Sequence, residues 1–283
     1  MVGTRNFPSV SRSLAAVVLL VAVTCAQWVL AADRDRLQAF LQVTGFDVAL
    51  DSIALSAADA PALLGMRASD FGANWSRIAD DVFDTGAMRD TALDILEQTL
   101  SDDDLAHAAS FYASPLGLRL VEVENDSHMV ADDARKQAEG EELVAAMVAS
   151  GDDRLDVLMQ MNAAVDSGDV AVRAVQEIQV RFLLAASVAG VLDQEIDEAT
   201  LRSLMKETEG ELRLSMRRSA LASAAFTYRD ISDADLRDYL DALQDPQMQR
   251  VYELMNAVQW EIMGDRYEAL AVRLAQIAGG QDL

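Results

Sequence analysis

Apolar side chains recur every three or four positions along most of this 283-residue chain. Near the start, Leu37, Phe40, Leu41 and Thr44 follow this spacing up to Gly45. Three later sets repeat it over two helical turns: Leu236, Tyr239, Leu240 and Leu243; Val251, Leu254, Met255 and Val258; and Tyr267, Leu270, Ala271 and Leu274. This spacing places apolar side chains on one face of an α-helix, whereas a half-buried strand needs alternation, which is almost absent. The pattern predicts an all-α fold, a multi-helix bundle in which each helix buries one stripe.

One stretch of the sequence occurs twice. The letters LSDDDL at residues 100–105 reappear as ISDADL at residues 231–236, a shift of 131 that holds without a gap for more than twenty residues. The two copies cover about residues 100–128 and 231–259. The match also favours a helix at residues 118–123, whose letters LRLVEV would otherwise suit a strand. We interpret the repeat as an internal duplication.

The duplication predicts how the chain is organised. We expect two similar helical halves, residues 32–150 and 151–283, which pack against each other with pseudo-twofold symmetry. The loop-forming letters ASGDD at residues 149–153 mark the boundary between them. A long helical region precedes the repeated block in each half, at residues 59–99 and 169–226.

Each copy of the block is expected to form a helix, a tight corner and a second helix. A serine caps the first helix and an aspartate follows three residues later, a shortened capping box. A serine or an aspartate then caps the second helix, whose first residue is proline because that position needs no N–H donor. The residues of this motif are Ser101, Asp104, Ser114 and Pro115 in the first copy and Ser232, Asp235, Asp245 and Pro246 in the second.

The first copy carries a further pattern, an aromatic pair followed by Ser-Pro and a nearby glycine. Its residues are Phe111, Tyr112, Ser114, Pro115 and Gly117. This pattern resembles a bacterial family of exported helical proteins catalogued as domain of unknown function 2059 (DUF2059). The second copy departs from it, since Ala242 and Leu243 replace the aromatics and Met248 replaces the glycine. The resemblance implies a periplasmic, all-helical protein of a Gram-negative bacterium, and it implies no particular activity.

The first 31 residues have the composition of a secretory signal peptide. Arg5 and Arg12 give a positive start, and residues 14–23 form an apolar run of about ten residues. Such a run is too short to cross a bilayer, which needs about 20 helical residues. We expect cleavage after Ala31 and a periplasmic location, with an uncleaved membrane anchor as the alternative.

Composition narrows the range of partners. The only cysteine, Cys25, lies in the signal, so the mature chain is expected to have no disulfide and no thiol chemistry. The formal net charge of −24 argues against nucleic acid and anionic lipid as partners. It favours solubility, divalent cations and basic partners, and we expect no stable membrane span after signal cleavage.

No metal or cofactor site is expected. The acidic clusters at residues 80–81, 102–104, 132–133 and 152–153 lack the ligand order of a calcium-binding loop, so we interpret them as solvated or capping groups. The chain has two histidines, His107 and His128, too few for a zinc site in a mature chain without cysteine. Glu124 and His128 are four residues apart on one helix, and we interpret them as a weakly coupled surface pair.

No catalytic residue is assigned. The chain contains no Gly-x-Ser-x-Gly elbow, and Ser114 is already explained as a cap. Methionines concentrate in the later half and either fill an irregular core, which we favour, or line an adaptable apolar groove. They are Met147, Met159, Met161, Met205, Met216, Met248, Met255 and Met263.

These observations lead to three functional hypotheses. The first is a non-enzymatic periplasmic module that binds a protein, peptide or apolar ligand between its two halves. The second is a cell-envelope hydrolase that uses a single carboxylate, which predicts an Asp or Glu buried in a cleft with a raised pKa. The third is a structural or stress-related envelope protein whose charge only keeps it soluble.

Overall fold

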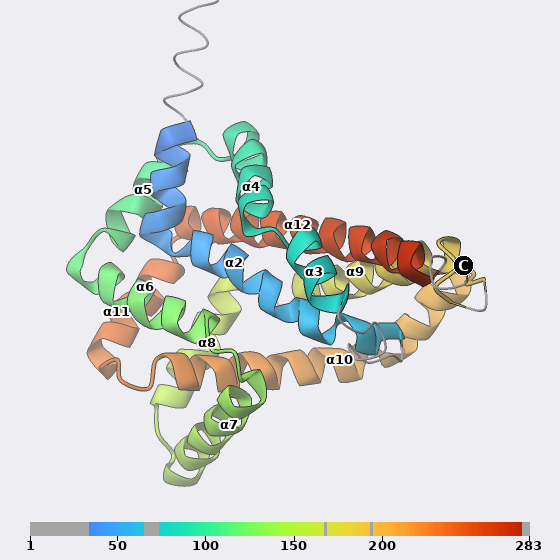
Figure 1. The fold of residues 1–283 in the computed structure, drawn as a ribbon. Helices are drawn as coiled ribbons and strands as arrows, with labels where there is room; N and C mark the ends of the chain where they lie inside the picture. Colours follow the sequence, from blue (N-terminus) through green and yellow to red (C-terminus); the bar gives the residue numbers. More distant parts are fainter. Residues whose placement is uncertain (1–33, 65–73, 167–168, 193–194, 279–283) are drawn as a thin grey trace, which may run out of the picture.

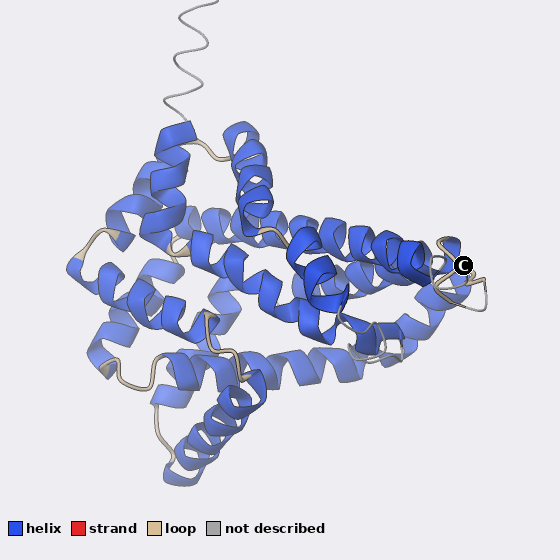
Figure 2. Ribbon diagram, viewed as in Figure 1, coloured by secondary structure: helices blue, strands red, loops and turns tan. Residues whose placement is uncertain are grey.

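The structure, a computed structural model, describes residues 34–64, 74–166, 169–192 and 195–278. Helices joined by short loops make up these residues, and no strand occurs in them (Figure 2). The all-α prediction is therefore confirmed. The predicted signal peptide, residues 1–31, lies outside the described part of the chain.

The chain folds into helices of very different lengths. Residues 34–44 form the first, and Gly45, with φ of 71°, turns the chain directly into the next. The remaining elements are α2 Phe46–Ser56, the 3-10 helix η1 Ala57–Leu64, α3 Asn74–Val82, α4 Thr85–Thr99, α5 Asp102–Tyr112, α6 Pro115–His128, α7 Asp133–Ser150, α8 Arg154–Val165, α9 Asp169–Val188, α10 Glu198–Thr227, α11 Asp233–Leu243 and α12 Pro246–Ala278.

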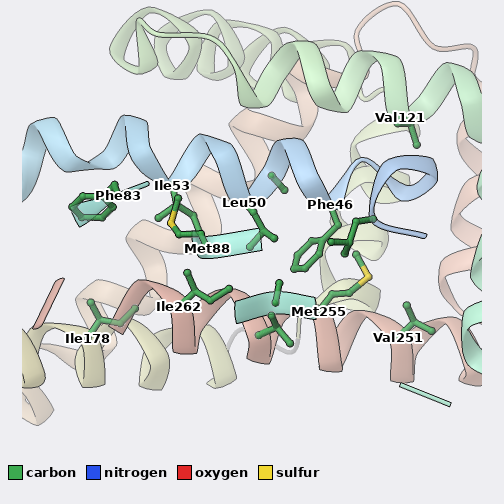
Figure 3. Close-up of a cluster of buried hydrophobic side chains, with 14 of the residues drawn as sticks. Phe46, Leu50, Ile53, Phe83, Met88, Val121, Ile178, Val251, Met255 and Ile262 are labelled. Atoms are coloured by element: carbon green, nitrogen blue, oxygen red, sulfur yellow. The ribbon is translucent and has the colours of Figure 1, made fainter. Parts of the chain in front are cut away.

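The two longest helices, α10 and α12, extend across the molecule on either side of α2 (Figure 1). Helix α12 packs along α9 and also contacts α3, α4 and α5, while α10 packs on α7, α8 and α9. In the core, Phe46, Leu50 and Ile53 of α2 point toward Met255 and Ile262 of α12 (Figure 3). The two apolar stripes predicted at residues 251–258 and 267–274 both lie on α12 and pack in the core.

The helical regions that precede the two blocks are interrupted. In the first, α3 and α4 are separate helices because Asp84 caps α4 by accepting a hydrogen bond from Ala87 N at 2.7 Å. In the second, α9 ends before Gly190, whose φ of 74° favours glycine, and Asp197 caps α10. The loop predicted at residues 149–153 is shorter than expected: only residues 151–153 form it, because Ala149 and Ser150 still belong to α7, which Gly151 ends with φ of 65°.

Four of the eight methionines in the later half fill the core, as the favoured interpretation predicts, whereas Met205, Met216 and Met263 are partly exposed. Met147, Met161, Met248 and Met255 are buried. Met159, by contrast, is 45% exposed and lies on a surface pocket described below. Within the described ranges, the helices are each too short or too polar to cross a membrane.

Glycine at position 140 allows α7 to approach α10 closely. A Cβ atom there would lie 2.2 Å from the Ala222 carbonyl oxygen, a backbone atom that cannot move aside alone. We expect Gly140→Ala to lower the free energy of unfolding by about 1–3 kcal/mol through overpacking. Gly210, on α10, has nothing within 4 Å of such a Cβ, and Gly210→Ala should raise the same free energy by about 0.5–1 kcal/mol. Urea denaturation of both variants checks this, and effects of the same sign would contradict it.

Candidate functional site

The first helix of each repeated block begins in the same way. Ser101 Oγ accepts a hydrogen bond from Asp104 N at 3.2 Å and donates to the Asp104 carboxylate at 2.7 Å. Ser232 Oγ accepts from Asp235 N at 3.1 Å and donates to the Asp235 carboxylate at 2.9 Å. Each pair satisfies a backbone donor at the start of α5 or α11, and these two helices have equal lengths of 11 residues.

The second helix of each block begins at its proline, after a polar cap. Ser114 Oγ accepts from Gly117 N at 3.1 Å, and Asp245 Oδ1 accepts from Gln247 N at 2.7 Å. A Cβ at Gly117 would lie 2.3 Å from the Phe111 carbonyl oxygen, so the first corner requires glycine. The second corner is wider there, because Met248 fills the corresponding position and is buried. Outside the blocks the correspondence ends, since α6 has 14 residues and α12 has 33.

Two ion pairs join the blocks reciprocally. Arg119 of the first block lies 3.0 Å from Asp235 of the second. Arg250, which is 131 positions after Arg119, lies 3.1 Å from Asp104, which is 131 positions before Asp235. Partly exposed pairs of this kind add little stability. Their reciprocity shows that the two blocks present the same local surface to each other.

A cluster of hydroxyl and carboxyl groups lies where the blocks meet. The four helices of the blocks contribute one group each: Tyr112 from α5, Glu124 from α6, Tyr239 from α11 and Tyr252 from α12. Tyr228, the residue that ends α10, adds a fourth hydroxyl. We call these five residues the Glu124 cluster. Tyr112 and Tyr239 are 2% and 1% exposed, so their hydroxyls need partners within the protein.

The hydroxyls of the cluster meet each other and one oxygen of Glu124. Tyr228 donates to Glu124 Oε1 at 2.7 Å, and the Tyr239 hydroxyl lies 2.9 Å from the same oxygen. The Tyr239 hydroxyl is also 2.9 Å from that of Tyr252 and 3.1 Å from that of Tyr112. Tyr112 and Tyr252 are hydrogen-bonded to each other as well. No described group donates a hydrogen bond to the other carboxyl oxygen, Glu124 Oε2.

Burial dominates the protonation of the cluster. It raises the pKa of Glu124 to about 7, although the hydrogen bonds from Tyr228 and Tyr239 act in the opposite direction. Burial also raises the pKa of Tyr112, Tyr228 and Tyr239, and the nearby carboxyl adds to this effect. The hydroxyls therefore keep their protons at neutral pH, and Glu124 is the group that titrates there.

A count of protons agrees with this assignment. Five hydrogen bonds join the five side chains, while four tyrosine hydroxyls carry only four protons. With Glu124 ionised, one oxygen–oxygen contact has no proton. A proton on Glu124 brings the number of protons to five, one for each of the five contacts.

Glu124 faces two pockets. The smaller, of about 170 Å³, lies against the turn at Gly45, and the larger, of about 330 Å³, lies between α6, α7, α8 and α10. His128 lines both, and the pKa of its imidazole is lowered by burial and by the Lys136 charge. Asn125 Oδ1 in the smaller pocket is buried without a hydrogen-bond partner. The prediction that Glu124 and His128 form a surface pair is therefore wrong for Glu124, because the side chains of Tyr228 and Tyr239 hold its carboxyl group away from solvent.

The aromatic pair of the first block has a role in this arrangement. The Phe111 ring stacks on that of Tyr239, with centroids 5.7 Å apart and an interplanar angle of 9°. Its neighbour Tyr112 supplies a hydroxyl to the cluster. The other histidine, His107, lies apart, with Nε2 3.3 Å from the Asp245 carboxylate. In the described ranges, no three His, Cys, Asp or Glu side chains lie close enough together to hold a metal ion.

Comparisons with known proteins identify one segment. No curated protein and no solved structure matches the chain. Helices α5 and α6, with Tyr112 and Glu124, fall within a matched segment, whereas the second block falls outside it. Residues 86–146 match the model of a family described as "Uncharacterized protein conserved in bacteria (DUF2059)", as the resemblance of the first block to this family implies.

Proposed function

We propose that this chain is an exported, non-enzymatic binding protein of the bacterial periplasm that holds a small ligand at Glu124. The observation that carries the proposal is a half-buried carboxyl group that lines a pocket and has one oxygen fixed by two tyrosines. The pocket has walls from both halves, with Glu124 and Lys136 from the first and Tyr228 and Tyr252 from the second. This lining supports the hypothesis that a ligand binds between the two proposed halves.

Its dimensions and chemistry suit a small molecule. Ligand pockets usually occupy roughly 300–1,000 Å³ and combine apolar walls with a few convergent polar groups. The larger pocket, of about 330 Å³, places Met161, Val165 and Leu243 beside the polar groups of Glu124 and Tyr252. Glu124 is the sole acid among the residues that line the two pockets. A hydrolase that needs a pair of carboxylates would find no second one in this lining.

The proposed location rests on the sequence. Arg5, Arg12 and the apolar run at residues 14–23 have the order of a signal peptide, with cleavage after Ala31. Mass spectrometry of protein recovered from periplasm should find a chain that begins at Ala32. A chain that still begins with Met1 and sediments with membranes would support the anchor alternative.

The repeated blocks are proposed to derive from a duplication of one helix–corner–helix unit, with pseudo-twofold symmetry between the copies. The equal first helices and the reciprocal ion pairs of Arg119 and Arg250 support it. The residues of the Glu124 cluster do not follow this symmetry. Each of its four residues in the blocks has an apolar, buried counterpart 131 positions away: Leu243 for Tyr112, Met255 for Glu124, Ala108 for Tyr239 and Val121 for Tyr252.

Native mass spectrometry tests the binding function directly. Protein purified from periplasm should carry a small-molecule adduct that is lost after unfolding and refolding. Ala220→Trp, which places a large ring at the wall of the larger pocket, should prevent the adduct from forming. Ala106→Trp, on the exposed side of α5 and outside both pockets, is the matched control and should keep the adduct. Bare monomer in every preparation would contradict the proposal.

One observation favours a second candidate, a cell-envelope hydrolase with a single carboxyl acid. A carboxyl with a pKa of about 7 in a pocket is suited to general acid catalysis near neutral pH. This candidate predicts that the purified protein clears a suspension of bacterial cell walls. It also predicts that Glu124→Gln abolishes the clearing, whereas Glu122→Gln, on the exposed side of the same helix, does not.

A further inference from the structure

An apolar pocket adjoins the pocket at Glu124. It has a volume of about 470 Å³ and lies between α8, α9 and α10. The two pockets share Asn162, Val165 and Ala220 in their linings, so they are neighbours on one surface. The apolar side chains that line only the apolar pocket include Met159, Leu214, Met216 and Leu221.

Two of the apolar side chains that line this pocket are exposed. Met159 is 45% exposed and Leu214 is 57% exposed, although both are large apolar side chains. Exposed apolar side chains that meet at a concave site mark a surface that a ligand can cover. Methionine is well suited to this because its flexible thioether adapts to ligand shape. The pocket therefore fits an alkyl chain or a similar apolar body.

We propose that the two pockets together hold one amphiphilic ligand, with a protonated amine bound at Glu124 Oε2 and an apolar chain in the Met159 pocket. The inference rests on the proposed binding function and specifies its ligand class. Glu124 Oε1 is already held by two tyrosines, so Oε2 is the oxygen left for a donor from the ligand. An N–H donor with positive charge makes the stronger bond to a carboxylate.

The charges around Glu124 permit a cation there. Lys136, from α7, is engaged by the Asp133 carboxylate and the Ser127 carbonyl, both at 3.3 Å. His128, on α6, is held neutral because its pKa is lowered. The groups that face Glu124 from α5, α10, α11 and α12 are tyrosine hydroxyls, which are uncharged at neutral pH. The net charge of −24 raises the local concentration of cations further.

The arginines that line the apolar pocket do not favour the reverse arrangement, in which an anionic head group lies in this pocket and the chain points to Glu124. Arg213 is paired with Asp169 at 3.0 Å and with Glu209 at 2.6 Å. Arg217 and Arg218 also line this pocket and are exposed to solvent. An anionic head group bound to them would place its chain against the polar residues of the Glu124 cluster.

Binding of an amine should release a proton. Glu124 carries its proton below neutral pH, and formation of the ion pair transfers this proton from the carboxyl group to solvent while the amine keeps its own. Calorimetric titration at pH 6 in two buffers of different ionisation enthalpy should therefore report close to one proton released per ligand bound. A neutral head group would release none.

Three probes with the same chain separate the possible head groups: decylamine, decanol and decanoate, each below its micelle concentration. We expect the mature protein to bind decylamine at least about tenfold more tightly than decanol, as a hydrogen bond to a charged group allows. Glu124→Gln should remove this preference. Glu122→Gln, which removes the same charge from the exposed side of α6, should preserve it.

The outcomes distinguish this inference from the binding function on which it rests. Tighter binding of decanoate, or equal binding of amine and alcohol, would overturn the amine assignment. If periplasmic protein carries an adduct that Ala220→Trp removes and decylamine does not displace, the binding function stands and the ligand class is wrong. If neither an adduct nor probe binding is found, both fail together.

Discussion

Replacement of Glu124 by glutamine should stabilise the protein at pH 8 and change its stability little at pH 5. The folded protein holds the pKa of this carboxyl at about 7, above its ordinary value of 4.5. Between these two values the folded state binds more protons than the unfolded state, so the contribution of Glu124 to stability falls as pH rises. The full loss in the free energy of unfolding that Glu124 causes is reached above pH 7 and is at most about 3 kcal/mol. Glutamine resembles the protonated acid and carries no charge to bury.

Urea denaturation of the wild type and of Glu124→Gln from pH 5 to pH 8 measures this effect as the difference between the two curves. The difference removes the contributions of all other titrating groups that the two proteins share. Glu122→Gln is the control, since Glu122 lies exposed on the same helix and loses the same charge. A difference for Glu124→Gln that stays constant with pH would show that this carboxyl titrates normally.

Replacement of Tyr239 should have the largest effect on stability. Its ring is 1% exposed, stacks on Phe111 and approaches Tyr228 at 6.0 Å between centroids. Tyr239→Ala removes this packing and leaves a cavity, so the free energy of unfolding should fall by about 3–5 kcal/mol. The hydroxyls of Tyr112 and Tyr252 would also lose a partner.

Tyr239→Phe separates hydrogen bonding from packing. It keeps the ring and removes only the hydroxyl, so the loss should be smaller, about 1–3 kcal/mol. It also removes a hydrogen bond that lowers the pKa of Glu124, so that pKa should rise further. Chemical denaturation of both variants tests the order of the two effects. Equal losses would mean that the hydroxyl network contributes all of the stability at this position.

Much of the architecture could be predicted because it depends on local rules. The spacing of Leu236, Tyr239, Leu240 and Leu243 predicts a helix, and all four are buried on α11. Caps are equally local, since a serine or aspartate needs only the backbone two or three residues ahead of it. The interruptions between α3 and α4 and between α9 and α10 are harder to predict, because helical spacing continues on both sides of each break.

The Glu124 cluster could not be predicted from helical spacing. Its five side chains come from five helices, and sequence spacing says nothing about which faces of different helices meet. The spacing of Glu124 and His128 shows that they share one helix face, but it does not show which other helices pack against that face. A signal was present in the repeat: the counterpart of Glu124 is Met255, and the counterpart of Tyr252 is Val121. A polar residue whose repeat counterpart is apolar can be expected to face the core.

Protonation of Glu124 is the property on which the proposed site depends most. ¹³C NMR titration of the glutamate side-chain carboxyls, with the Glu124 signal assigned by its loss in Glu124→Gln, measures that protonation in the folded protein. The structure predicts a midpoint near pH 7, as burial among tyrosines requires. A midpoint near the ordinary value of 4.5 would contradict the account, because Glu124 would then be solvated and no carboxyl cluster would define the site.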